Sequence, residues 1–182
     1  MSPSERDAPV LHFLNHLEAA TLDAIAARII PGDADDPGAR EAQAVVFIDR
    51  SLAGFLREQQ TPYRVGLRRL DAYTTERYGR PFAALESSKQ DEVLAELDRR
   101  AVAGGDDPLG RLFAVVREHV VQGTLSDPSH GGNRNGVGWR MVGFPGARWG
   151  YSTREMARDF DATTIPLTTL ADLYAGDRSM GA

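Results

Sequence analysis

The sequence contains no cysteine, and this absence excludes several kinds of chemistry. Disulfides, thiol nucleophiles, zinc–thiolate centres and iron–sulfur clusters all require cysteine. Lysine is almost absent as well, since Lys89 is the only one among 21 basic residues. With a net charge of -5 and no cluster of basic side chains, the chain lacks the positive face that nucleic-acid binding needs. We therefore expect neither thiol chemistry nor a nucleic-acid ligand.

Long apolar runs are also missing. No stretch of about 18 apolar residues occurs, so no membrane-spanning helix is expected. The first twenty residues, MSPSERDAPVLHFLNHLEAA, do not show the basic region followed by an apolar region that an export signal has. They contain no twin-arginine pair either. The sequence as written therefore carries no recognisable export signal.

The chain does contain a series of apolar stripes at helical spacing, separated by proline and glycine. Its 182 residues, 42% of them hydrophobic, suit one domain with a core large enough to fold without metals or disulfides. No strand is predicted, because the β-branched pairs at 45–46 and 115–116 lie inside helical periods. The expected fold is therefore all-α, with about five amphipathic helices in one bundle-like domain.

The ends of these five helices are predicted from residues with known capping preferences. The first helix has a capping box of Asn15 and Glu18 and ends at Pro31-Gly32. The other four are predicted to run from Asp36-Pro37 with a stripe of Val45, Ile48, Leu52 and Phe55, from Thr61-Pro62 to Gly79, from a capping box of Ser87 and Gln90 to Gly104-Gly105, and from Asp107-Pro108 to Gly123.

After these helices the character of the sequence changes. Residues 123–150 hold eight of the 18 glycines and both tryptophans, Trp139 and Trp149. A structureless segment of this length is uncommon in a compact domain unless it is functional or disordered. Disordered segments are poor in aromatic residues. We therefore expect an ordered surface loop whose glycines permit positive φ angles and whose aromatic side chains anchor it.

The catalytic and ligand-binding motifs that contain glycine-rich loops are incomplete in this sequence. His130-Gly131-Gly132 is similar to the oxyanion loop of some esterases, but no G-x-S-x-G nucleophile motif accompanies it. GGNRNG is not followed by Gly-Lys-Ser/Thr and lies in no βαβ unit, which argues against a phosphate or dinucleotide loop. The loop DADDPG lacks the bidentate glutamate of a calcium site. No complete catalytic constellation is found.

His119, His130 and Asp127 are the residue types that could form a metal site, but their spacing matches no recognised ligand pattern. His119 continues the apolar stripe of the fifth helix, three residues after Val116. A histidine in such a position is more often a hydrogen-bonded core residue than a ligand. We therefore expect no metal and no cofactor in this chain.

The run SDPSHGGNRNGVGWRMVGFPG, within residues 125–146, resembles the signature of the gluconate 2-dehydrogenase subunit 3 family. IIPGDADDPGAREAQAV and RPFAALESSKQDEVL are similar to upstream segments of that family, so the resemblance covers about residues 12–150. By this resemblance, the candidate partner-binding residues are Asp127, Pro128, His130, Gly131, Gly132, Asn133, Arg134, Trp139, Phe144, Pro145 and Gly146.

Membership would imply a mostly helical small subunit of a flavin-dependent sugar or polyol dehydrogenase. In such complexes the large subunit is of the glucose–methanol–choline oxidoreductase type and carries the FAD and the catalytic residues. The small subunit is needed for the large one to mature, and in some complexes a cytochrome subunit passes electrons onward. The resemblance thus implies a non-catalytic subunit that binds, stabilises or matures such a dehydrogenase.

Many members of the family carry a twin-arginine signal, which this chain lacks, and an aromatic residue where it has His130. The chain as written is therefore expected to be cytoplasmic. The alternative is a periplasmic protein whose signal was removed or whose partner is exported. The single domain is divided into a loosely ordered start (1–12), a helical core (13–123), the signature loop (124–150) and a tail (151–182).

Two other hypotheses remain open from the sequence. The chain could be a stand-alone ligand-binding protein or enzyme that uses loop 126–146 as a pocket, with Asp127, His130, Asn133 and Arg134 as its polar groups. It could also be a scaffold whose loop packs only on its own helices, in which case Trp139 is buried. The tail contains an apolar set, Ile165, Leu167, Leu170 and Leu173, that must be covered by this domain or by a partner.

Overall fold

The computed structural model describes residues 10–33 and 35–180, with the side chains of 176–180 left aside. Within these ranges the regular structure is helical, and no β-strand is formed. The all-α prediction is thus confirmed for the described chain. Its helices are α1 (His16–Ile29), α2 (Ala44–Ala53), α3 (Gln60–Tyr78), α4 (Ser87–Ala103), α5 (Pro108–Leu125), α6 (Val137–Met141) and α7 (Leu170–Met180).

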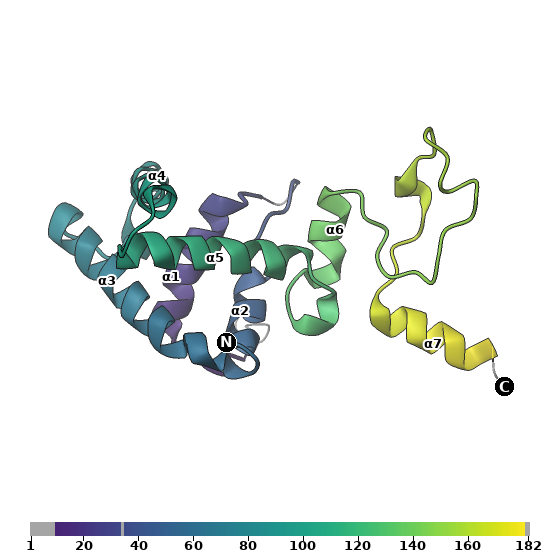
Figure 1. The fold of residues 1–182 in the computed structure, drawn as a ribbon, viewed down its shortest axis with the longest axis horizontal. Coiled ribbons are helices and arrows are strands. Elements are labelled where there is room, and N and C mark those ends of the chain that lie inside the picture. The colour runs from purple at the N-terminus through teal and green to yellow at the C-terminus, as the bar shows by residue number, and fades with distance from the viewer. Residues whose placement is uncertain (1–9, 34, 181–182) are drawn as a thin grey trace, which may run out of the picture.

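Helix α5 is the centre of the bundle. It runs along the length of the helical body and contacts α1, α2, α3 and α4 (Figure 1). Its apolar face, with Val116 and Val120 fully buried, closes the core. The largest fully buried side chains of the other helices include Leu22, Ile25, Ile48, Leu52, Tyr63, Leu67, Leu70, Val93 and Leu97.

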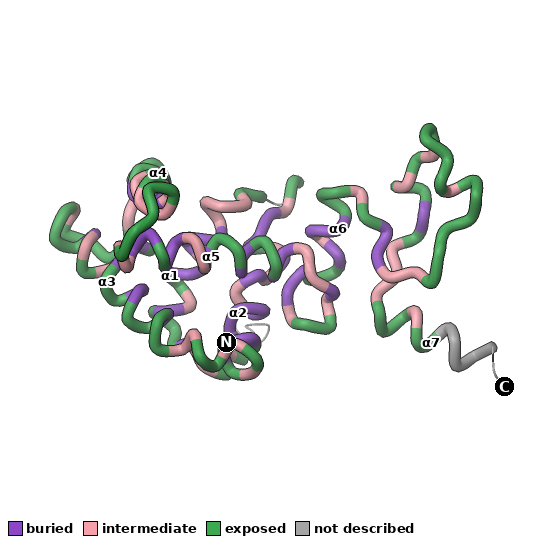
Figure 2. The backbone as a smooth tube through the Cα atoms, in the orientation of Figure 1, coloured by how far each residue is buried: buried purple, intermediate pink, exposed green. Residues whose placement is uncertain are grey.

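The remaining chain extends away from this bundle. After α6 it forms an irregular segment and then α7, which lie beyond α6 at the opposite end of the molecule from α3 and α4 (Figure 1). Figure 2 shows that most of this segment is exposed, whereas the buried residues gather in the bundle and around α6. The predicted loop and tail thus contain two helices, α6 and α7, that the sequence patterns did not predict.

Several predicted helix ends are confirmed. The capping box of Asn15 and Glu18 starts α1, and Asp107 with Pro108 starts α5. Gly79 and Gly104 end α3 and α4 with positive φ angles, a conformation that costs glycine little. The predicted start of the third helix at Thr61-Pro62 differs by one residue from the observed start.

One predicted helix start and one predicted capping box were wrong. The second helix begins at Ala44 and not at Asp36-Pro37, because residues 39–43 form turns and Gln43 has a left-handed φ of 56°. The helix also ends before Phe55, which is exposed and so is no part of its apolar stripe. In α4, Ser87 and Gln90 form no capping box, because the Gln90 amide instead donates to the carbonyl oxygen of Phe82.

The predicted end of the fifth helix at Gly123 was also wrong, since α5 continues to Leu125. Gly123 lies inside the helix, where it faces the start of α2. A Cβ there would lie 2.9 Å from the Ala44 carbonyl oxygen and 3.1 Å from the Phe47 Cβ. The residue is therefore a close-packing glycine and not a helix terminator.

The chain before α1 is held by a buried carboxylate that the sequence patterns did not reveal. Asp49 is fully buried in α2. Its oxygens accept hydrogen bonds from the backbone N–H groups of His12 (2.6 Å), Phe13 (3.0 Å) and Leu14 (2.8 Å). Of the predicted loosely ordered segment 1–12, residues 1–9 lie outside the described chain, and His12 is bound in this way.

Replacing this carboxylate should destabilise the domain. We expect Asp49→Ala to lower the free energy of unfolding by about 3 kcal/mol, because three backbone N–H groups, that of Leu14 buried, lose a charged acceptor. Asp98→Ala is the control, since Asp98 makes only an exposed ion pair with Arg117 and should cost at most about 1 kcal/mol. Urea denaturation followed by circular dichroism measures both changes, and equal losses for the two variants would contradict this role of Asp49.

Candidate functional site

Asn133 fixes the signature loop to the end of α5. The residue is fully buried and has a left-handed φ of 46°. Its backbone N–H donates to the carbonyl oxygen of Gly123 (2.8 Å), and its side-chain amide donates to that of Ser126 (2.8 Å). Its side-chain oxygen accepts the N–H of Gly138 (2.8 Å). One side chain thus joins the end of α5 to the start of α6.

Two glycines allow the loop to approach α5 closely. A Cβ on Gly132 would lie 2.0 Å from the Gly123 carbonyl oxygen, and one on Gly138 would lie 1.9 Å from the Thr124 carbonyl oxygen. Real Cβ atoms do not approach backbone atoms so closely. Gly132 and Gly138 of the signature are therefore required by backbone packing.

Trp139 is a core residue of this junction, with 5% of its surface exposed. Its indole N–H donates to the carbonyl oxygen of Leu125 (2.7 Å), which lies in the last turn of α5. The Phe144 ring packs edge-on against it, with ring centroids 5.3 Å apart. The burial of Trp139 is what the scaffold hypothesis requires for this side chain.

Asp127 connects the loop to the C-terminal segment. One of its carboxylate oxygens accepts the N–H of Ser129 (2.9 Å), and the other accepts the N–H of Leu170, the first residue of α7 (2.9 Å). Burial raises the pKa of Asp127, but the hydrogen bonds from Leu170 and Ser129 and the charge of His130 outweigh it, so this pKa lies below its ordinary value. The carboxylate is therefore charged at neutral pH.

A short backbone pairing strengthens the same connection. The Thr168 N–H donates to the Pro145 carbonyl oxygen (3.0 Å), and the Ala147 N–H donates to the Thr168 carbonyl oxygen (2.7 Å). Thr169 and Asp172 then cap the start of α7, with the Thr169 hydroxyl 2.6 Å from the Asp172 carboxylate. The chain between Ala147 and Leu170 is thus held at both of its ends beside the signature loop.

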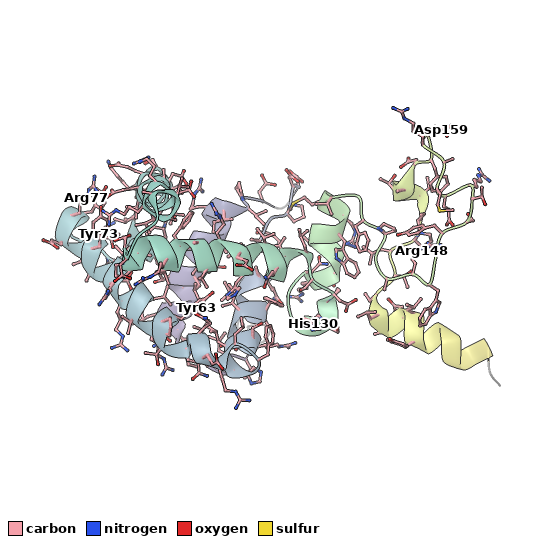
Figure 3. The ribbon with its side chains drawn as sticks, in the orientation of Figure 1. Tyr63, Tyr73, Arg77, His130, Arg148 and Asp159 are labelled. Carbon is pink, nitrogen blue, oxygen red and sulfur yellow. The ribbon has the colours of Figure 1, made fainter. Side chains whose placement is uncertain are left out.

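The structure brings all eleven candidate residues to one region, but few of them face solvent. The buried members are Asp127, Gly132, Asn133, Trp139, Pro145 and Gly146. Pro128 and Gly131 are half-buried, and the exposed members are His130, Arg134 and Phe144. Figure 3 shows His130 on the side of the loop that faces away from α6. Only the three exposed side chains are open to a partner without rearrangement.

The polar groups that a ligand pocket would need lie elsewhere. A recess of about 460 Å³ adjoins the loop and is lined by Trp139, Phe144 and residues 162–167. Asp127, His130, Asn133 and Arg134 do not line it, nor do they line the recess between Pro37 and Met141. The side-chain polar atoms of Asp127 and Asn133 are also hydrogen-bonded to backbone groups of the same chain.

His119 is a hydrogen-bonded core residue. Its Nδ1 lies 2.6 Å from the Tyr63 hydroxyl, which reaches it from α3 (Figure 3 labels Tyr63). Burial lowers the pKa of His119 below its ordinary value of 6.5, against a smaller effect of Glu118, and burial raises the pKa of Tyr63. Within the described residues, no three histidine or carboxylate side chains are arranged to hold a metal ion.

Apolar residues gather on the C-terminal part of the chain, and the sequence patterns did not predict this. Of the fourteen large hydrophobic side chains found exposed in the described chain, eight lie between residues 141 and 174: Met141, Val142, Phe144, Trp149, Tyr151, Met156, Leu170 and Tyr174. Of the apolar set predicted to need cover, Ile165 is buried, Leu167 and Leu173 are half-buried, and Leu170 is exposed. The bundle leaves this surface uncovered.

Comparison with known families identifies the chain. The profile of the family described as gluconate 2-dehydrogenase subunit 3 matches residues 16–146. The chain belongs to this family. The matched range contains the bundle, the signature loop and α6, and it stops where the exposed C-terminal segment begins. No curated protein and no solved structure matched the chain.

The family name describes a subunit of a dehydrogenase, so a complex with a partner is implied. Among the helices of the described chain, none has both the length and the apolar content needed to cross a membrane.

The close approach of α6 to α5 leads to a stability prediction. Gly138→Ala should lower the free energy of unfolding by about 2 kcal/mol or more, because its methyl group meets the Thr124 carbonyl oxygen. Gly150→Ala is the matched control, since nothing lies within 4 Å of its Cβ position, and it should be near neutral. Urea denaturation measures both; a Gly138 variant as stable as the control would show that the loop does not need this contact.

The buried His119 leads to a pH prediction. Its pKa is lowered on folding, so the unfolded chain binds the proton more tightly. Its contribution to stability is therefore complete above about pH 6.5 and is lost as the pH falls below that value towards the folded-state pKa. Urea denaturation at pH 7.5 and 5.5 should show a smaller loss of stability for His119→Gln than for the unmodified protein. An unchanged difference between the two pH values would contradict the prediction.

Proposed function

We propose that this chain is a non-catalytic small subunit that binds and stabilises an FAD-dependent sugar or polyol dehydrogenase of the glucose–methanol–choline type. Membership of a family named for a dehydrogenase subunit carries this proposal. The eight exposed apolar side chains between 141 and 174 support it, because large apolar side chains exposed in one part of a chain are typical of a protein interface.

A non-catalytic role agrees with the hydrogen bonds that three polar residues make within the chain. Asp127 and Asn133 are hydrogen-bonded to backbone groups of the same chain, and His119 is bonded to Tyr63 in the core. A catalytic acid, base or ligand must instead reach the reacting atoms. We therefore assign the FAD and the catalytic residues to the large subunit, with a cytochrome subunit as a further member in some complexes.

The second candidate function is a stand-alone enzyme or ligand-binding protein that uses loop 126–146. The recess of about 460 Å³ beside this loop is the observation that favours it. Its lining is mainly apolar or threonine side chains with Arg140, and it contains none of the four polar residues that this hypothesis needs. We therefore place it second.

Co-expression tests the two functions. A candidate flavoprotein of this type should be expressed with the chain and, as a control, with a frame-shifted copy of the chain's gene. A partner that binds only the folded flavoprotein raises its stability by mass action. We expect the chain to co-purify with the flavoprotein and to raise its yield, FAD content and thermal midpoint.

Two results would overturn this proposal. One is a flavoprotein that folds, retains FAD and turns over equally well with the frame-shifted copy. The other is sugar or alcohol oxidation by the purified chain alone, lost in Asp127→Ala and His130→Ala variants that remain folded, which would support the stand-alone function.

A further inference from the structure

The exposed C-terminal segment is built as an ordered surface. We call residues 147–174 the arm, and from here on the signature loop means residues 124–146. Glu155 accepts hydrogen bonds from the Ser152 N–H (2.7 Å) and hydroxyl (2.8 Å), and its other oxygen pairs with Arg148 (3.0 Å). The Arg148–Glu155 pair is largely shielded from solvent, with about a quarter of each side chain exposed. Figure 3 shows Arg148 on the inner side of the arm, with Asp159 near its tip.

This hydrogen-bonded turn holds large apolar side chains in solvent. Trp149 is 70% exposed and Met156 is 68% exposed, while Tyr151 is exposed beside the Arg148 guanidinium, 5.4 Å from its ring centroid. Tryptophan, tyrosine, methionine and arginine are the residue types enriched at protein interfaces. Because the turn is already ordered, less conformational entropy is lost when a partner covers it.

The backbone and charges of the arm argue against a membrane as the covering surface. Most of residues 147–161 are irregular, and hydrocarbon cannot accommodate backbone groups that lack internal partners. The arm carries three arginines and four acidic residues, so it has no basic excess that would attract an anionic lipid surface. A protein surface with an apolar recess fits this mixture better.

We propose that the arm is the surface by which the chain docks on the folded flavoprotein subunit, and that Asp127 and Asn133 act as positioning residues that hold it. This inference rests on the function proposed above, and it adds which part of the chain makes the contact. Six of the eleven candidate residues of the signature loop are buried, whereas the arm that the loop anchors projects beyond α6 (Figure 1). The partner is a different chain, because the family name implies a subunit of a dehydrogenase complex.

The test compares two double variants that remove similar apolar area. Trp149→Ala with Met156→Ala alters the arm. Leu17→Ala with Phe55→Ala alters the bundle, where the two side chains are 79% and 74% exposed. The dissociation constant of each for the purified flavoprotein is measured by calorimetry, after circular dichroism has shown that both variants fold. We expect the arm variant to bind at least about tenfold more weakly and the bundle variant to bind normally.

The outcomes separate this inference from the proposed function. If the unmodified chain binds the flavoprotein and the arm variant binds as tightly, the arm is not the docking surface but the subunit function stands. If the unmodified chain does not bind at all, both fail. If light scattering shows that the unmodified chain is a dimer and the arm variant a monomer, the arm serves a second copy and the inference is overturned.

Asp127→Asn tests the positioning role through a readout other than binding. The amide offers one acceptor oxygen in place of two, so the bond to Ser129 or to Leu170 is lost. We expect trypsin to cleave after Arg148, Arg154 or Arg158 at least several-fold faster in this variant, with cleavage in the bundle unchanged. Equal cleavage rates in the arm would show that Asp127 does not hold it.

Discussion

The connection between Asn133 and the end of α5 is the interaction on which the chain after α5 depends for its position. The last carbonyl groups of a helix have no partner within the helix and need donors from elsewhere. Here the Asn133 backbone, the Asn133 amide and the Trp139 indole supply them, at Gly123, Ser126 and Leu125. Because α5 contacts every other helix of the bundle, the same loop that ends it also fixes the direction in which the chain leaves the core.

The helical fold could be predicted because its signals are local. Asn15, Asp107, Gly79 and Gly104 act on backbone groups within one turn of themselves, so each can be interpreted without knowing the fold. Gly123 has the same appearance in the sequence as a terminating glycine, but its role is set by the backbone of α2 packed against it. Asp49 likewise depends on residues more than thirty positions away. Contacts of this range leave no periodic pattern in a single sequence.

The signature could be found in the sequence, but the directions of its side chains could not be predicted. Aromatic residues and asparagine in a glycine-rich loop are compatible both with an interface and with internal packing. The choice between these depends on whether a carbonyl group such as that of Leu125 lies within reach of the Trp139 indole. The arm could not be predicted because its exposed side chains follow no periodic pattern. Trp149, Tyr151 and Met156 have no helical or strand spacing, and only the fold shows that they remain exposed.

The contacts that anchor the arm have a consequence for partner recognition. On the arm's side they are made by backbone groups: the Leu170 N–H donates to Asp127, and the Thr168 N–H donates to the Pro145 carbonyl oxygen. Backbone contacts place little demand on the side chains of residues 148–161. Outside the turn of Arg148, Ser152 and Glu155, those side chains are therefore free to match the surface of one partner, while the signature matches elements of its own chain. A fixed internal anchor and an independently adaptable surface together explain why the motif can be buried in a protein whose proposed role is to bind another.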